Sequence, residues 1–112
     1  MNIEQKPQIV QVAYDFSLVL LPQIAKMPRH HRYELGQRLE EKTLDFLEML
    51  IDATYSRDKK QILQQANLSL EKIRFLLRLC FDLRLWDLKK YENFSKRTVD
   101  IGVQLGGWIK AS

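Results

Sequence analysis

Hydrophobic residues recur along this chain at steps of three and four positions, the spacing that places them on one face of an α-helix. Ile9, Ala13 and Phe16 begin the first such series, and similar series follow through the rest of the chain. No stretch alternates apolar and polar residues as a strand would. The pattern predicts four helices, over residues 8–27, 31–55, 59–85 and 89–110. Four helices with short loops favour an all-α fold, an up-down-up-down four-helix bundle in which residues 1–112 form one domain.

The apolar face of each predicted helix supplies the expected core. The positions are Ile9, Val12, Ala13, Phe16, Leu20 and Ile24; Leu35, Leu39, Thr43, Phe46, Leu50 and Ala53; Ile62, Ala66, Leu70, Ile73, Leu77, Cys80 and Phe81; and Tyr91, Phe94, Thr98, Ile101, Leu105 and Trp108. Tyr91 and Phe94 are therefore interpreted as core residues and not as a platform on which bases stack.

Two local signals refine this prediction. Ser56 or Asp58 is the expected N-cap of the third helix, because a short polar side chain can accept a hydrogen bond from a free backbone N–H. Gly102, Gly106 and Gly107 lie inside the last helix, where each glycine costs about 1 kcal/mol relative to alanine. They indicate a close approach to a neighbouring backbone or fraying near the helix end.

The third helix has more apolar surface than one bundle core can use. From Ile73 to Trp86 apolar residues cover nearly its whole circumference, leaving a narrow polar stripe. The stripe consists of Asn67, Glu71, Arg74, Arg78 and Asp82. Because large leftover apolar surface usually marks an interface, we expect a homo-oligomer. Arg74 and Arg78 either form ion pairs with Glu71 and Asp82, or contact a nucleic acid or protein partner.

The densest basic segment is Arg29-His30-His31-Arg32, and no acid interrupts residues 26–33. It lies at a predicted helix start, where free N–H groups and the helix dipole favour anions. Phosphate binding would use these features together, and a solvated loop with ordinary surface charge is the alternative. The whole chain carries 18 Lys and Arg against 14 Asp and Glu, an excess of +4 that permits a polyanion partner without requiring one.

Candidate catalytic groups are few. The 112 residues contain one cysteine, which excludes an intramolecular disulfide, and none of the common phosphate-loop, metalloprotease or hydrolase motifs. His30 and His31 are adjacent, so their side chains should diverge by about 100° on a helix and chelate one metal poorly. Cys80 lies in an apolar helix and is interpreted as a structural thiol. We therefore expect no enzyme activity, no cofactor and no metal.

Nothing in the sequence indicates export or a membrane. The N-terminal residues lack the order of a signal peptide. The most apolar stretch, residues 9–24, is too short and too polar to span a bilayer. The lone cysteine is typical of a reducing compartment, so a cytoplasmic location is expected.

Three segments resemble one protein family. Residues 21–30, Leu-Pro-Gln-Ile-Ala-Lys-Met-Pro-Arg-His, resemble the first helix and basic turn of the accessory variability determinant (Avd) proteins of diversity-generating retroelements. Residues 73–79 resemble their third-helix Arg-Phe-x-x-Arg signature, and residues 105–110 their final Leu-Gly-x-Trp-Ile segment. The similarity extends from about residue 8 to 110. The wider superfamily also includes four-helix proteins encoded in intervening sequences of ribosomal RNA genes.

The resemblance implies a non-catalytic accessory protein that assembles as a pentameric barrel of four-helix bundles. Such a protein binds the reverse transcriptase of the retroelement and its template RNA, or DNA, during mutagenic copying. Arg74 and Arg78 match the third-helix arginines of the partner-binding surface, and Arg29, His30, His31 and Arg32 match the basic turn. The modest net charge and the lack of a basic tail after Lys110 depart from the pattern. A protein-interaction bundle of the intervening-sequence type is the alternative, and an enzyme using His30 or His31 a third.

Overall fold

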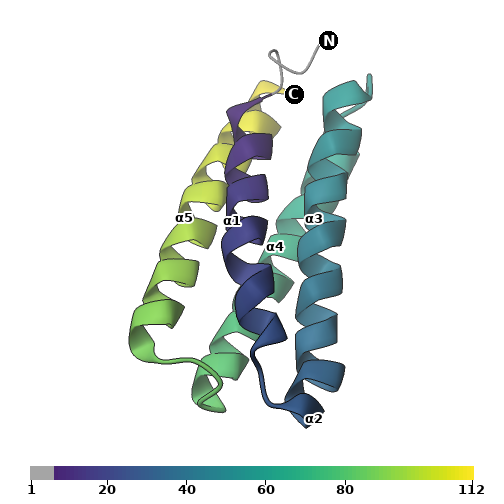
Figure 1. The fold of residues 1–112 in the computed structure, drawn as a ribbon. Helices are drawn as coiled ribbons and strands as arrows, with labels where there is room; N and C mark the ends of the chain where they lie inside the picture. The colour runs from purple at the N-terminus through teal and green to yellow at the C-terminus, as the bar shows by residue number, and fades with distance from the viewer. Residues whose placement is uncertain (1–6) are drawn as a thin grey trace.

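The computed structural model describes residues 7–112. Four long helices form a bundle: α1 (Gln8–Ala25), α3 (Gln37–Tyr55), α4 (Lys60–Asp82) and α5 (Leu88–Ala111). A short helix, α2 (Arg29–His31), and a π-helical segment, η2 (Arg32–Gly36), connect α1 to α3. Successive long helices run in opposite directions (Figure 1). The predicted all-α, up-down-up-down bundle is therefore confirmed for residues 7–112, which contain no strand.

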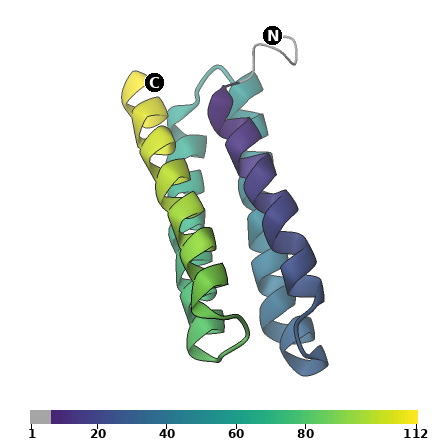
Figure 2. The ribbon, with the colours of Figure 1, turned by 60° about the vertical axis from the view of Figure 1, so that its left-hand side comes forward.

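Each long helix packs against two of the others. Both α1 and α4 contact α3 and α5, so the four helices form a square in cross-section. Turning the molecule shows the antiparallel pair of α4 and α5 beside the pair of α1 and α3 (Figure 2). The bundle is 42 Å long. One end carries α2 and the α4–α5 connection, and the opposite end carries the α3–α4 connection and the last turn of α5 (Figure 1).

The core follows the predicted apolar faces closely. Most of the expected positions are buried, from Ala13 and Phe16 on α1 to Ile101 and Leu105 on α5. Six are only partly buried, because they lie at the edges of these faces: Val12, Leu35, Ile62, Phe81, Tyr91 and Trp108. The core also includes residues that were not predicted, among them Val10, Met27, Leu63 and Trp86.

The α3–α4 connection differs from its prediction. Neither Ser56 nor Asp58 caps α4, since the residue at the cap position is Lys59, which has helical backbone angles and no capping hydrogen bond. The Lys59 ammonium instead donates to the carbonyl oxygens of Ala53 at 2.7 Å and Ser56 at 2.6 Å. A cation at the C-terminal end of a helix satisfies free carbonyls and complements the helix dipole. Lys59 therefore stabilises the end of α3.

The glycines of α5 are not explained by close packing within the chain. At Gly102 an added Cβ would lie 3.6 Å from the Leu70 side chain, which is ordinary contact. At Gly106 and Gly107 it would meet nothing within 4 Å. Within residues 7–112 there is therefore no close approach at Gly106 or Gly107, and the alternative of fraying near the helix end stays a prediction.

A different glycine holds the α1–α3 connection against α1. Gly36 is buried, and a Cβ there would lie 3.1 Å from Ile24 and 3.2 Å from the sulfur of Met27. The chain restarts its helix at Arg29, two residues before the predicted start, and passes through the π-helical turn to reach α3. Because Gly36 has no side chain, η2 can lie directly on the last turn of α1.

The α4–α5 connection closes α4 with a Schellman motif. The Arg84 N–H donates to the Phe81 carbonyl and the Leu85 N–H to the Cys80 carbonyl, both at 2.9 Å. Arg84 has a φ of 63°, the left-handed conformation that this motif requires and that glycine adopts most easily. An arginine at this position is strained by roughly 1–2 kcal/mol.

Substituting Arg84→Gly is expected to raise the free energy of unfolding by about 0.5–1 kcal/mol, because glycine relieves this strain but has more freedom in the unfolded chain. Urea denaturation followed by circular dichroism measures the change. Arg84→Ala is the control, since it removes the same charge and keeps a Cβ. Equal stability of the two variants would contradict the strain.

Trp86 fixes the connection to the bundle. Its side chain is 5% exposed, and its indole N–H donates to the Leu77 carbonyl at 3.2 Å. Its ring meets Phe94 edge-on at 5.1 Å between centroids. The side chain of Asp87 then accepts a hydrogen bond from the Lys90 N–H at 2.8 Å and caps α5. Both ends of this short connection are thus anchored.

By length and composition alone α1 could cross a membrane, so the expectation that residues 9–24 are too short and too polar is wrong by that criterion. Core helices of bundles meet the same criterion, and seven residues of α1 are buried. The expectation of no membrane partner stays a prediction.

Candidate functional site

A basic turn, which we define as residues 26–33, connects α1 to α3. Pro28 has extended backbone angles, so the chain leaves α1 there and begins a new helix at Arg29. The Arg32 guanidinium donates to the carbonyl oxygen of Ala25 at 3.2 Å and thereby caps α1. Lys26 and Arg29 are exposed, and neither takes part in the two ion pairs found among residues 7–112. The turn thus presents uncompensated positive charge.

The two histidines of the basic turn lie against each other. Their ring centroids are 3.9 Å apart and their planes are inclined by 41°. The predicted divergence of His30 and His31 is wrong, because rotation about the side-chain bonds brings the rings together although their Cβ atoms point apart. Residues 7–112 contain no group of three or more His, Cys, Asp or Glu placed to hold a metal ion.

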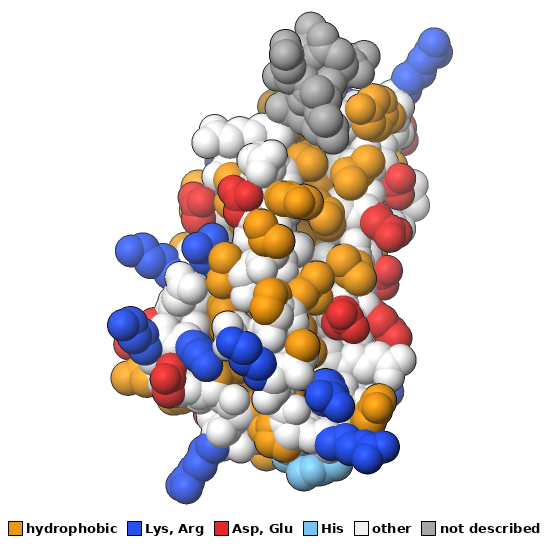
Figure 3. Space-filling model, in the orientation of Figure 1, with side chains coloured by type: hydrophobic (Ala, Val, Ile, Leu, Met, Phe, Trp, Pro, Cys, Tyr) orange, Lys and Arg blue, Asp and Glu red, His pale blue; other side chains and the backbone are white. Residues whose placement is uncertain are grey.

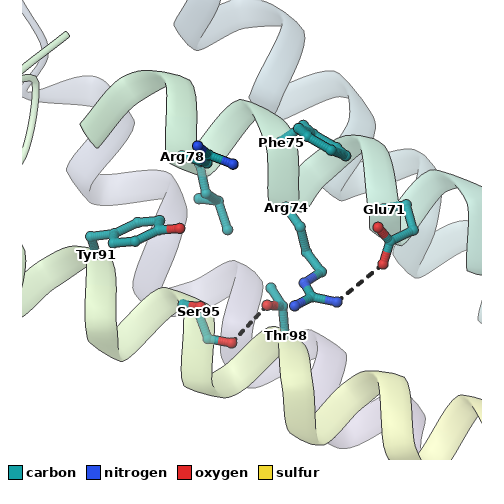
Figure 4. A pocket seen from close by; sticks show the side chains of 8 residues that line it. Glu71, Arg74, Phe75, Arg78, Tyr91, Ser95 and Thr98 are labelled. Atoms are coloured by element: carbon teal, nitrogen blue, oxygen red, sulfur yellow. Dashed lines mark hydrogen bonds and ion pairs between the residues drawn. The ribbon is translucent and has the colours of Figure 1, made fainter. Parts of the chain in front are cut away.

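A groove of about 220 Å³ runs between α4 and α5 and includes both predicted third-helix arginines. Its lining includes Glu71, Arg74, Phe75, Arg78, Tyr91 and Ser95. Figure 4 shows the Arg74 side chain extending from α4 toward α5, with the Tyr91 hydroxyl on the opposite wall. Guanidinium and hydroxyl groups together bind carboxylates or phosphates. Phe75 is 66% exposed and adds an apolar rim.

Tyr91 combines two roles in this groove. Its ring is half-buried and stacks on Phe81 at 4.7 Å between centroids, whereas Phe94 is fully buried. The core interpretation is therefore confirmed for Phe94 and holds for Tyr91 only in part, since the groove also includes Tyr91.

Both arginines of the groove form the ion pairs that their spacing predicted. Arg74 bonds Glu71 at 3.1 Å, and Arg78 lies 3.8 Å from Asp82. Such exposed pairs contribute roughly 0–1 kcal/mol each. A partner carboxylate or phosphate could therefore replace either acid at little cost, so these pairs are compatible with a binding role.

The structure does not unite the predicted site residues on one surface. The basic turn connects α1 and α3, whereas Arg74 and Arg78 line a groove between α4 and α5. Sequence reasoning missed Tyr33, which lies at the end of the basic turn, and the Tyr91 and Ser95 side of the groove. Tyr33 could have been found from its position directly after the basic cluster. Nothing in the sequence pattern indicated the groove.

The similarity of this chain to known proteins extends over nearly its whole length. A family model described as bAvd-like matches residues 4–112. The chain belongs to the bAvd-like family. The resemblance to the Avd proteins that three short segments indicated is thereby confirmed. Comparisons with curated proteins and with solved structures give no match.

This bAvd-like protein carries its positive charge mainly in one half of the bundle. The half that contains α2 and the α4–α5 connection, residues 16–46 and 71–99, has thirteen Lys and Arg against eight Asp and Glu. The other described residues have four Lys and Arg against five Asp and Glu. Figure 3 shows most of the Lys and Arg side chains over the lower part of the molecule, and Asp and Glu side chains along the α3 side and also on the α5 side.

The bAvd-like chain also exposes apolar side chains on α4, as its sequence predicted. Leu68, Phe75 and Leu79 on α4, and Leu83 directly after it, are each exposed by 45% or more. Leu68, Phe75 and Leu79 follow one another at helical spacing and form an outer apolar stripe. Exposed apolar residues also occur on α1 and α5 (Figure 3). A surface of this kind is typical of a protein that binds other chains.

Cys80 is a buried thiol in this bAvd-like protein. Its side chain is inaccessible to solvent, and burial raises the pKa of the Cys80 thiol to about 12. A thiol that stays protonated at neutral pH is a poor nucleophile. The structure therefore agrees with a packing role for Cys80.

Proposed function

We propose that this bAvd-like protein is a non-catalytic accessory protein of a diversity-generating retroelement. In this role it binds the reverse transcriptase and the template RNA and supports mutagenic reverse transcription. Family membership supports the retroelement setting. The observation that carries the proposal is the concentration of uncompensated Lys and Arg in the half of the bundle that contains the basic turn.

The basic half would bind the RNA through its phosphates. Contacts between Lys or Arg and phosphates release counterions, so their affinity falls steeply with salt and depends little on sequence. The basic turn suits such contacts because Lys26 and Arg29 are exposed and no acid lies within it.

The groove between α4 and α5 would bind the reverse transcriptase. Arginine, tyrosine and exposed aromatic side chains are the residues that contribute most often to protein interfaces. Arg74, Phe75 and Tyr91 meet in this groove. The RNA would thus contact the basic turn and the enzyme the groove, two surfaces within the same half of the bundle.

Assembly into a homopentamer would multiply both surfaces. The exposed apolar side chains outside the groove, such as Leu68 and Leu79 on α4, support self-association, since burying them would remove apolar area from water. A ring would also bring the basic halves of several chains together, which raises the affinity for one RNA molecule through multivalency.

Light scattering on the purified protein, alone and with structured RNA at two salt concentrations, tests this proposal. The expected result is a pentamer that binds RNA and releases it as salt rises. A monomer or dimer that is indifferent to RNA would contradict the proposal and favour a protein-interaction bundle without a retroelement partner.

The double variant Arg74→Glu, Arg78→Glu tests the groove. We expect it to fold normally, because both side chains are exposed, and to lose binding to the reverse transcriptase in a pull-down experiment. The control is Lys60→Glu with Lys72→Glu, which makes the same charge change at exposed positions of α4 outside the groove. Normal binding by the groove variant would contradict the assignment.

A further inference from the structure

Tyr33 is an exposed aromatic ring at the end of the basic turn. Its side chain is 59% exposed. It lies in η2, which leads directly into α3 and its buried core residues. The Arg29 and Arg32 guanidinium carbons lie 5.8 Å and 5.5 Å from the centre of its ring. Both guanidinium groups lie over this largely exposed ring, so a base that displaces one of them can stack on the ring while the arginine binds the adjoining phosphate.

The backbone holds this ring in a defined position. Tyr33 belongs to the π-helical turn η2, and such turns are rare and frequently occur at functional sites. Gly36, at the end of the same turn, packs closely on Ile24 and Met27. Arg32 is fixed by its hydrogen bond to the Ala25 carbonyl. The ring and one of its two arginines are therefore anchored to the end of α1.

We propose that Tyr33 stacks on an unpaired base of a single-stranded RNA segment while Arg29 and Arg32 contact the adjoining phosphates. Every base has a π-face, so stacking on tyrosine needs no particular sequence, and guanidinium groups add cation–π attraction. The inference rests on the proposed RNA binding and adds the class of RNA, because the bases of a duplex are not free to stack on a side chain.

The charges around Tyr33 also affect the path that the backbone of a bound RNA strand can take across the basic turn. Tyr33 also borders a groove lined by Glu34, Gln37, Arg38 and Glu41, in which two carboxylates face one guanidinium. The Glu41 carboxylate accepts a hydrogen bond from Gln37 at 3.2 Å, and both acids are exposed. The net charge of this groove is negative and repels phosphates, which favours a path of the RNA backbone past Arg29.

Fluorescence anisotropy with a labelled oligouridylate and with a labelled RNA duplex tests this inference. Tyr33→Ala is expected to weaken oligouridylate binding by about 5- to 150-fold, the usual effect of removing one stacking ring. Tyr33→Phe should bind normally because it keeps the ring. Duplex binding should be unaffected by either change, and the salt dependence of oligouridylate binding should not change because no phosphate contact is lost.

Tyr55→Ala is the matched control. Tyr55 is also 59% exposed and lies at the last residue of α3, at the opposite end of the bundle from Tyr33. Its removal should leave oligouridylate binding unchanged. Equal binding by wild type and Tyr33→Ala would overturn the stacking inference while leaving RNA binding intact. If the wild-type protein binds neither RNA, the proposed RNA binding itself is wrong.

Discussion

Replacing Arg29, Lys89 and Lys90 with glutamate is expected to weaken the binding of single-stranded RNA by roughly two powers of ten at about 0.1 M salt. Each phosphate contact to a single strand contributes about 0.7 to the slope of log affinity against log salt, which is about fivefold at this salt concentration. Loss of three contacts therefore amounts to about a hundredfold. The slope itself should fall by about two, which a salt titration of RNA affinity measures directly.

A second triple variant, at the opposite end of the bundle, distinguishes the effect of where the charges lie from the effect of the net charge of the protein. Arg57→Glu, Lys60→Glu and Lys110→Glu change the net charge equally, and all three side chains are exposed. Arg29, Lys89 and Lys90 lie near helix N-termini, where a carboxylate is favourable. The loss of RNA affinity in their variant should therefore not reflect unfolding. The variant at the opposite end should bind RNA nearly as well as wild type. Equal loss in both variants would show that net charge, not its position, determines RNA binding.

Trp86→Ala is expected to lower the free energy of unfolding by about 3–5 kcal/mol, the usual cost of removing a large aromatic ring from a core. The ring fills the space between the end of α4 and Phe94, and its indole N–H donates to the Leu77 carbonyl. Because a domain is stable by only about 5–15 kcal/mol, this loss is a large fraction of the total. Urea denaturation followed by circular dichroism measures it without relying on tryptophan fluorescence.

Two further variants identify the source of this stability. Trp86→Phe keeps most of the buried ring and loses one hydrogen bond, so it should cost clearly less than alanine. Trp108→Ala removes the other tryptophan, which is only half-buried, and should also cost less. If Trp86→Ala and Trp108→Ala were equally destabilising, the α4–α5 connection would not be the anchor that its burial indicates.

The long helices could be predicted because their stability depends on periodic burial. Ala13 and Phe16, like Ile101 and Leu105, follow the helical step and are buried as expected. The connections could not be predicted in the same way, because their geometry depends on contacts between distant elements. Lys59 caps the end of α3 instead of allowing Ser56 or Asp58 to cap α4, an outcome that no propensity of either residue indicates.

The sequence predicted individual residues of the candidate site, but it did not predict the surfaces that those residues form with other helices. The pairing of Arg74 with Glu71 followed from their spacing on one helix. The wall that α5 adds to the same groove depends on how two helices pack, which spacing cannot reveal. The position of Tyr33 directly after the basic cluster was visible in the sequence, but its contacts with two guanidinium groups and its place in a π-helical turn were not.

The separation of charge along the bundle changes what its net charge means. Electrostatic interactions between exposed groups fade over about 10 Å at 0.1 M salt, whereas the bundle is 42 Å long. An approaching polyanion therefore experiences the half with thirteen cations and eight acids, and hardly the half with four cations and five acids. Locally the protein behaves as more basic than its overall +4. Encounters should consequently be oriented, with the basic half leading, and raising salt should slow the rate of association.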